Sequence, residues 1–245
     1  FLGNLLKSIR KRYQKIPTRG ICFDSRKIKK KDIFFAIKGN QTSGTKYIEE
    51  AISKGASAIV SNKRVKIKNH QIPLLLVKDV RKSLSEACSN FYKKKPPNIV
   101  AVTGTNGKSS VADFFYQILN SNKISVASIG TLGILSKNYN KKIKLTSIDP
   151  LSLHKNLQIL TKNKINNVIL EASSHGLDQK RLDNLNIRVG IFTNLSHDHL
   201  DYHKNMKSYF NSKMYLFKNL LTKNSIIITD NEINEFKTIK NISNK

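Results

Sequence analysis

The stretch IVAVTGTNGKSS at residues 99–110 constrains the fold of this 245-residue chain more than any other feature. Its first part is a β-branched run typical of a buried parallel strand, and apolar residues recur at helical spacing in the SSVADFFYQILN that follows. A strand, a glycine-rich turn and a helix N-terminus direct backbone N–H groups, with the helix dipole behind them, to one point. The stretch therefore predicts a phosphate-binding loop within an α/β domain.

The residue types in the predicted loop suit a phosphate and a metal ion. Gly104 and Gly107 let the backbone approach an anion closely. Lys108 adds a positive charge, and Ser109 offers a hydroxyl to a magnesium ion. The common template G-x-x-x-x-G-K-[ST] is not fully met, because its first glycine would fall on Val102. The alternative is an ordinary tight turn between a strand and a helix that binds nothing.

Composition indicates a cytoplasmic globular protein. No apolar stretch approaches the ~20 residues needed to span a bilayer, so no membrane partner is expected. The two cysteines, Cys22 and Cys88, lie far apart in the sequence and are expected to be reduced and packed. The net charge is +28, but only eight of the 44 basic residues are Arg, and the lysines are scattered. Arg is the preferred reader of bases and phosphates, so no nucleic-acid partner is expected.

The sequence predicts two α/β domains. The boundary between them is expected at KKKPPN, residues 93–98, because no helix can continue through its two prolines. Residues 1–95 are expected to form a small N-terminal domain, and residues 98–245 a mainly parallel sheet covered on both faces. Strands are predicted at 32–39, 57–62, 73–79, 99–102, 125–130, 167–174, 189–195 and 225–230. Helices are predicted at 45–56, where Gly55 closes the helix, at 80–94 and at 109–120.

Polar residues after the predicted strands are candidate site residues, because ligands of such sheets gather at the carboxyl ends of the strands. Glu171 comes directly after an apolar strand and could hold the magnesium of a nucleotide, or merely cap a loop. The next strand end carries five Asp and His side chains, His197, Asp198, His199, Asp201 and His203. Such a cluster suggests metal or phosphate chemistry, and magnesium is favoured over zinc because no cysteine is nearby.

Four ordered motifs, TGTNGKSS, EASSHGLDQKRL, FTNLSHDHLDYH and YFNSKMYLF, together resemble those of the Mur ligases. The similarity is to the MurE type, which adds the third residue of the peptidoglycan stem peptide. DSRKIKKKDIFFAIKG and YIEEAISKGASAIV also resemble the first domain of that family, so the match runs from about residue 20 to about residue 220. The family's loop is Gly-Thr-Asn-Gly-Lys, which accounts for Val102.

The resemblance implies a set of site residues, with ATP and Mg²⁺ as cofactors. The ATP phosphates would lie on Gly104, Thr105, Asn106, Gly107, Lys108, Ser109 and Ser110. Catalytic roles would fall to Lys108, Glu171, His199 and Lys213. Magnesium would be held by Ser109, Glu171, His199 and, as a carbamate, Lys213. The UDP-linked substrate would contact Ser25, Asn40, Gln41, Thr42, Thr146, Ser147, Ser173, Gln179 and Arg181.

Lys213 illustrates what the resemblance adds. By itself, a lysine in SYFNSKMYLF, an otherwise apolar helical face, is expected to carry its ammonium to solvent. As a carbamate it would instead be an anionic magnesium ligand. Other positions depart from the family: TSI at 146–148 replaces Thr-Thr-Pro, SG at 43–44 replaces Asp-Gly, and His197 and Asn40 replace Arg and His. Ser147 keeps the hydroxyl and stays in the predicted site.

The implied activity is that of an ATP-dependent amide ligase in cell-wall synthesis. It would add a diamino acid, expected to be meso-diaminopimelate, to UDP-N-acetylmuramoyl-L-Ala-D-Glu through an acyl phosphate. The alternatives are a MurF-type ligase or folylpolyglutamate synthase, a P-loop NTPase that binds nucleic acid, and a binding module without catalysis. The family's C-terminal domain is expected to be absent, so these residues alone are expected not to complete catalysis. We expect a monomer.

Overall fold

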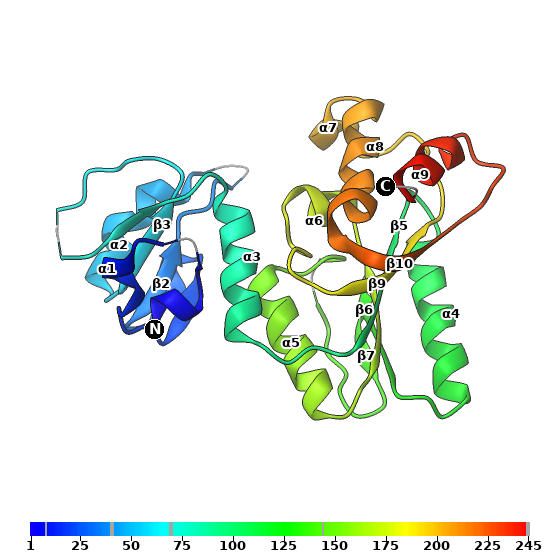
Figure 1. Cartoon of the computed structure of the whole chain (residues 1–245), viewed down its shortest axis with the longest axis horizontal. Helices are drawn as coiled ribbons and strands as arrows, with labels where there is room; N and C mark the ends of the chain where they lie inside the picture. The colour runs from blue at the N-terminus through cyan, green and yellow to red at the C-terminus, as the bar shows by residue number, and fades with distance from the viewer. Residues whose placement is uncertain (8, 40–41, 69–70, 144, 244–245) are drawn as a thin grey trace. The chain divides into compact units, whose positions relative to one another are not determined.

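The computed structural model describes residues 1–7, 9–39, 42–68, 71–143 and 145–243. It divides into two compact units, Phe1–Lys93 and Lys94–Lys245, and the division falls inside the KKKPPN stretch. Figure 1 shows a separate sheet in each unit. Among the described residues, no helix combines the length and the apolar character needed to cross a membrane. Both cysteines are buried and free, as predicted.

The first unit is built on a four-stranded parallel sheet in the order β1-β2-β3-β4. Its elements are η1 (Leu2–Asn4), α1 (Lys11–Gln14), β1 (Gly20–Cys22), η2 (Ser25–Lys27), β2 (Asp32–Phe35), η3 (Gly44–Tyr47), α2 (Ile48–Ser53), β3 (Ala58–Ser61), β4 (Leu74–Leu76) and α3 (Val80–Phe91).

The core of the first unit follows from its apolar strands. Every residue of β2 and β3 is buried, as expected for parallel strands with both faces covered. Phe34 of β2 and Ile59 of β3 pack with Ala51 of α2 in one cluster. Gly55 has φ +91 just after α2, which confirms the predicted glycine stop. The three-residue strand β1 is too short for periodicity to reveal, and it was not predicted.

The second unit contains a six-stranded sheet in the order β10-β9-β5-β8-β6-β7, in which only β7 is antiparallel to its neighbour. The predicted mainly parallel α/β fold is therefore confirmed. Its elements are β5 (Asn98–Thr103), α4 (Lys108–Ser121), β6 (Val126–Gly130), β7 (Gly133–Ser136), α5 (Pro150–Lys162), β8 (Asn167–Glu171), α6 (Ser174–Asp178), β9 (Ile187–Phe192), α7 (Leu200–His203), α8 (Met206–Tyr215), the π-helical turn η4 (Leu216–Leu220), β10 (Leu221–Thr229) and α9 (Phe236–Ser243).

Strand β5 lies inside this sheet, and its side chains alternate between the two faces. Val100 and Val102 pack with α4 on one face, whereas Ile99 and Ala101 join the larger core that includes Leu157 of α5. Figure 1 shows α4 and α5 on opposite sides of the strands. This sandwich holds the end of β5, and with it the loop at 104–107, between two packed layers.

Near its β10 edge, the second sheet is not fully covered by other elements, and apolar side chains there are exposed to solvent. Ile226 and Ile228 of β10 are 59% and 51% exposed, although they continue the apolar rows of β9. Two of the predicted apolar positions of α4, Phe114 and Ile118, are also exposed rather than packed on the sheet. The helix uses Val111, Ala112 and Phe115 instead, so the predicted helix is present but its packing face is narrower than predicted.

Candidate active site

A cavity of about 280 Å³ lies around the loop between β5 and α4. Side chains and backbone from several strand ends converge on it. The lining residues are Gly104, Thr105, Asn106, Gly107, Lys108, Ser109, Ser110, Thr131, Thr146, Glu171, Ser173, Ser174, His199, Tyr209 and Lys213. All seven predicted phosphate-loop residues and all four predicted catalytic residues are among them. The sheet order makes this possible, because β8 and β9 flank β5 on either side.

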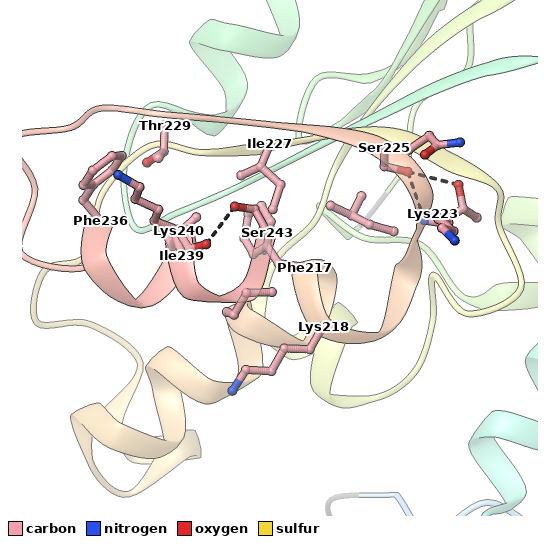
Figure 2. A pocket seen from close by; sticks show the side chains of 14 residues that line it. Phe217, Lys218, Lys223, Ser225, Ile227, Thr229, Phe236, Ile239, Lys240 and Ser243 are labelled. Carbon is pink, nitrogen blue, oxygen red and sulfur yellow. Dashed lines mark hydrogen bonds between the residues drawn. The ribbon is translucent and has the colours of Figure 1, made fainter. Parts of the chain in front are cut away.

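A larger hollow of about 1270 Å³ lies beside β10, η4 and α9 (Figure 2). Phe217, Ile227 and Ile239 contribute apolar surface to it. Among the described residues that line it, the ionisable side chains are Lys218, Lys223 and Lys240, with no carboxylate or imidazole. The smaller cavity therefore has the more varied chemistry, despite its lower volume.

Backbone geometry explains the two glycines of the phosphate loop. Gly104 and Gly107 have φ of +150 and +82, where side chains are disfavoured. A Cβ atom at Gly104 would also lie 1.8 Å from Oγ1 of Thr193 and 3.1 Å from the backbone nitrogen of Asn194, so a larger residue would require the loop or the segment after β9 to shift. Helix α4 starts at Lys108, directly after Gly107, and its first N–H groups lack partners within the helix. These groups and the helix dipole favour an anion at the loop.

The segment after β9 holds the loop in place. The backbone N–H of Thr105 donates to the carbonyl of Asn194 at 2.9 Å, and that of Asn106 donates to Asn194 Oδ1 at 3.0 Å. Thr193 Oγ1 donates to the carbonyl of Asn106 at 2.7 Å. Two loop residues are therefore tied to the neighbouring strand end. A loop fixed in this way does not have to be ordered when a phosphate binds.

Glu171 ends β8 and is only 3% exposed. Its carboxylate accepts hydrogen bonds from Ser109 Oγ at 2.8 Å and from the backbone N–H of Thr131 at 2.7 Å. A Cβ at Gly130 would lie 2.0 Å from Glu171 Oε1, so a glycine is needed for this close approach. The carboxylate is thus directed at the first turn of α4, where a metal ion between it and a phosphate would also lie.

Lys108 and Lys213 donate to the same backbone oxygen, the carbonyl of Gly104. The Nζ of Lys108 donates to the carbonyls of Gly104 at 3.1 Å and Thr105 at 2.7 Å. The Nζ of Lys213, on α8, donates to the carbonyl of Gly104 at 2.6 Å and lies 4.2 Å from the ring centre of Tyr209. Lys213 is 1% exposed, so the expectation of an ammonium in solvent is wrong.

Burial changes the ionisation of both lysines. Burial first, and then the charge of Lys108, lower the pKa of Lys213 to about 7, against an opposing effect of Asp198. Burial also lowers the pKa of Lys108, whereas the carboxylates of Glu171 and Asp198 act to raise it. The neutral amine of Lys213 is therefore well populated near neutral pH, unlike that of an exposed lysine.

Of the five Asp and His residues after β9, only His199 lines the cavity. His199 has φ +52, and its backbone N–H donates to Asp198 Oδ1 at 2.8 Å. Its ring lies 5.0 Å from that of His175, centre to centre. His203 is turned into the protein and is 6% exposed. Within the described chain, no three His, Cys, Asp or Glu side chains are grouped to hold a metal, so the five residues do not form one metal cluster.

The predicted substrate residues of the second unit fall into two groups. Thr146 and Ser173 line the cavity, whereas Ser147, Gln179 and Arg181 do not. Ser147 is 5% exposed. Its hydroxyl donates to the carbonyl of Glu171 at 2.8 Å and accepts from the backbone N–H of Ser173 at 2.9 Å. This hydroxyl already has both a donor and an acceptor partner, so it holds the backbone beside Glu171.

In the first unit, the predicted uridine-binding residues are only partly described. Ser25 is 6% exposed, and its hydroxyl donates to Glu50 Oε2 at 2.8 Å. Thr42 is exposed. Asn40 and Gln41 lie outside the described residues.

Thr131 and Tyr209 line the cavity but were not predicted from the sequence. Thr131 follows β6, and its hydroxyl lies 3.1 Å from that of Thr146. Tyr209, on α8, lies 3.2 Å from Thr105 Oγ1 through its hydroxyl and contacts Lys213 through its ring. The strand-end rule, applied to the predicted strand at 125–130, could have identified Thr131. No local signal marks Tyr209, whose role depends on how α8 packs.

Comparison with known proteins gives the same family over both units. Residues 17–101 match the model of the Mur ligase family, catalytic domain, and residues 102–245 match that of the Mur ligase middle domain. The UDP-N-acetylmuramoyl-L-alanyl-D-glutamate--2,6-diaminopimelate ligase of Rickettsia montanensis is 40% identical over 95% of this chain and 49% of its own length. The ligase of the same name from Rhizobium meliloti (strain 1021) is 43% identical over 89% and 45%.

Solved structures agree. A UDP-N-acetylmuramoyl-L-alanyl-D-glutamate--2,6-diaminopimelate ligase aligns with a TM-score of 0.82 at 29% identity, over 96% of this chain and 48% of that one. MurF ligase from Thermotoga maritima in complex with ADP aligns with a TM-score of 0.57 at 25% identity, over 89% and 47%. The chain thus spans about half the length of the curated relatives and solved structures that it matches.

Proposed function

The chain belongs to the Mur ligase family, and on this premise we propose that it takes part in the ATP-dependent addition of 2,6-diaminopimelate to UDP-N-acetylmuramoyl-L-Ala-D-Glu. The activity is the one named for its relatives of 40% and 43% identity. We further propose a cytoplasmic location, where ATP is supplied. One observation carries the proposal, the convergence on one cavity of Lys108, Ser109, Glu171, His199 and Lys213.

The phosphate loop would bind the triphosphate of ATP. Its glycines allow close backbone approach, and the first turn of α4 offers N–H groups to the anion. Lys108 now donates to two carbonyls of its own loop, and its ammonium would turn to the terminal phosphates when ATP binds. The pairing of an acidic substrate with a triphosphate requires such positive charge, because both reacting partners are anions.

The residues present suit magnesium. Magnesium prefers oxygen ligands and keeps waters and substrate phosphates in its coordination sphere, so it needs only one or two protein carboxylates. The Glu171 carboxylate and the Ser109 hydroxyl, 2.8 Å apart on the cavity wall, supply two oxygens, and His199 supplies a nitrogen. A magnesium ion bound there would neutralise charge on the phosphates.

We propose that Lys213 is carbamylated. Its Nζ is buried against a carbonyl and an aromatic ring, and burial favours the neutral amine that attacks CO₂. The nitrogen forms a bond to the carbon of CO₂, and loss of one proton leaves the carbamate anion. This change would add two oxygens to a cavity in which Glu171 is the one carboxylate among the described lining residues. Carbon-13 NMR after incubation with labelled bicarbonate tests it, and loss of the signal in Lys213→Met is expected.

In the proposed reaction, a substrate carboxylate oxygen attacks the γ-phosphorus of ATP. An acyl phosphate and ADP form. The neutral amine of the diamino acid then attacks the acyl carbon, phosphate leaves with the electrons of the broken C–O bond, and the nitrogen gives one proton to the departing phosphate as the amide forms. In this proposal, the contribution of this chain would be to hold the two anions together.

Calorimetric titration of the chain with UDP-N-acetylmuramoyl-L-Ala-D-Glu, near physiological salt, tests the proposal. We expect saturable binding that weakens by about tenfold or more in Arg181→Ala, since a charged hydrogen-bonding group is lost. Arg188→Ala, an exposed arginine of β9, is the matched control and should bind as the parent does. If the UDP-substrate does not bind while single-stranded DNA binds tightly and with a steep salt dependence, the ligase proposal is wrong.

A further inference from the structure

We propose that Tyr202 is a positioning residue whose hydroxyl orients the Gln179 amide and, through it, the Arg181 guanidinium. This inference rests on the proposed function, in which Gln179 and Arg181 contact the UDP-linked substrate. Tyr202 belongs to α7, after β9, whereas the other two residues follow α6, after β8. The three side chains therefore connect two strand-end segments of the second sheet.

The first step is the hydroxyl of Tyr202. It donates to Asp178 Oδ2 at 2.7 Å and accepts from Gln179 Nε2 at 3.3 Å. A phenolic hydroxyl has one proton to donate, and Tyr202 donates it to the Asp178 carboxylate. The hydroxyl oxygen can therefore only accept from Gln179, so it is the NH₂ group of the Gln179 amide that faces Tyr202. The side-chain amide of Gln179 is thereby oriented with its carbonyl oxygen away from Tyr202.

The second step is the guanidinium of Arg181. Its Nε and Nη2 donate to Gln179 Oε1 at 3.2 and 2.7 Å, and its Nη1 donates to the carbonyl of Ser147 at 2.5 Å. A guanidinium has no acceptor, so only the orientation of Gln179 that Tyr202 imposes can receive it. The plane of the guanidinium is fixed by contacts on two sides.

The third step links this network to the cavity. The carbonyl of Ser147 accepts the hydrogen bond from Arg181, and the hydroxyl of the same residue donates to the carbonyl of Glu171. The ring of Tyr202 is held separately, 4.1 Å from the His175 ring and 4.7 Å from the His203 ring, centre to centre. Because the ring has its own packing partners, Tyr202→Phe should remove the hydroxyl and leave the packing intact.

Tyr202→Phe tests the inference by calorimetry with UDP-N-acetylmuramoyl-L-Ala-D-Glu and, separately, with ADP. We expect the UDP-substrate to bind about three- to tenfold more weakly, since Arg181 must then be ordered on binding, and ADP affinity to be unchanged. Tyr215→Phe is the matched control. Its hydroxyl also donates to a carboxylate, Asp183 Oδ2 at 2.8 Å, but is not part of the network, so both affinities should stay at the parent values.

A double-mutant cycle of Tyr202→Phe and Arg181→Ala separates positioning of Arg181 from a general structural effect of Tyr202. In an Arg181→Ala background, Tyr202→Phe should weaken UDP-substrate binding by a smaller factor than it does in the parent, because Gln179 remains but the guanidinium that it positions is gone. Additive effects would overturn the inference, as would equal affinities for Tyr202→Phe and Tyr215→Phe or a parallel loss of ADP affinity. Failure of the parent chain to bind the UDP-substrate would overturn the proposed function itself, and this inference with it.

Discussion

Lys213 and His154 are both buried basic side chains of the second unit, with 1% and 0% exposure, but their surroundings differ. Lys213 lines the cavity and donates to the carbonyl of Gly104. His154, on α5, lies beside the core residues Leu153 and Leu157. Within the described chain its ring nitrogens make no hydrogen bond of regular geometry, although a backbone group of Asp183 acts to raise its pKa. Burial lowers the pKa of Lys213 to about 7 and, with the charge of Lys95, that of His154 to about 3.

The difference shows that a strongly lowered pKa does not by itself identify a functional group. The same physical cause, loss of hydration of the charged form, acts on both side chains. Of the two, Lys213 lines the cavity, where it donates to the carbonyl of Gly104, whereas His154 does not line it. His154 is a neutral core residue that the fold tolerates. Three substitutions, which give four predictions, break or sharpen this comparison.

The largest effect is expected for Lys213→Met on nucleotide binding. If the proposed carbamate is a magnesium ligand, the gain in ATP affinity that magnesium provides should fall by about 10–100-fold. Calorimetric titration with ATP, with and without Mg²⁺, measures it. His154→Leu is the control and should bind like the parent. Equal magnesium dependence in Lys213→Met and the parent would contradict a ligand role.

Lys213→Met should also raise the free energy of unfolding when CO₂ is removed from the buffer. The folded pKa of Lys213 is about 7 and its ordinary value is 10.5, so below pH 7 the folded state carries the full cost of a buried cation. That cost falls as the pH rises from 7 to 10.5. Lys213→Met should gain about 1–2 kcal/mol at pH 6, fading toward pH 10. Urea unfolding followed by circular dichroism checks this, and a gain independent of pH would refute it.

His154→Leu should show a gain of the same sign in a different pH window. The folded pKa is about 3 and the ordinary value 6.5, so the parent loses stability as the pH falls from 6.5 to 3. The variant should gain about 1 kcal/mol at pH 5.5, from a slope of ~1.4 kcal/mol per pH unit. Above pH 6.5 this gain should disappear. Thermal melts from pH 5 to pH 8 would reveal it, and a difference that grows above pH 6.5 would show that the histidine is not neutral in the fold.

The smallest effect is expected for an exposed basic residue. Arg26 pairs with Asp24 at 2.9 Å, but its side chain is 83% exposed. Water screens such a pair, so Arg26→Met should leave the melting temperature unchanged within error from pH 5 to pH 8. If the melting temperature of Arg26→Met shifted as much as that of His154→Leu, loss of charge rather than loss of burial would explain the stability changes of the buried variants.

Much of the fold could be predicted, because regular elements have local causes. The strands β2, β3 and β5 are apolar runs, and Gly55 stops a helix through its own φ. The packing face of α4 was only partly predicted. Phe114 and Ile118 fit the helical period, but they are exposed because the sheet below α4 contacts a narrower strip.

The candidate site was predicted less evenly. The loop and Glu171 could be found from their strands, and Lys213 only through a family resemblance. The position of Ser147 was predicted, but its hydroxyl is occupied by backbone partners that no sequence pattern reveals. Thr193 and Asn194 were missed because their partners are backbone groups of a distant loop.

The sequence by itself determined the type of loop, the alternation of strands and helices, and the chemistry available at each strand end. Those features depend on neighbouring residues, whose spacing and φ preferences are local. The tertiary structure alone decided which strand ends meet. Ser109 and Glu171 are 62 residues apart in the chain, and Gly104 and Lys213 are 109 apart, yet each pair forms a hydrogen bond. The order of strands in the sheet and the burial of α8 bring them together, and burial then sets the ionisation of Lys213.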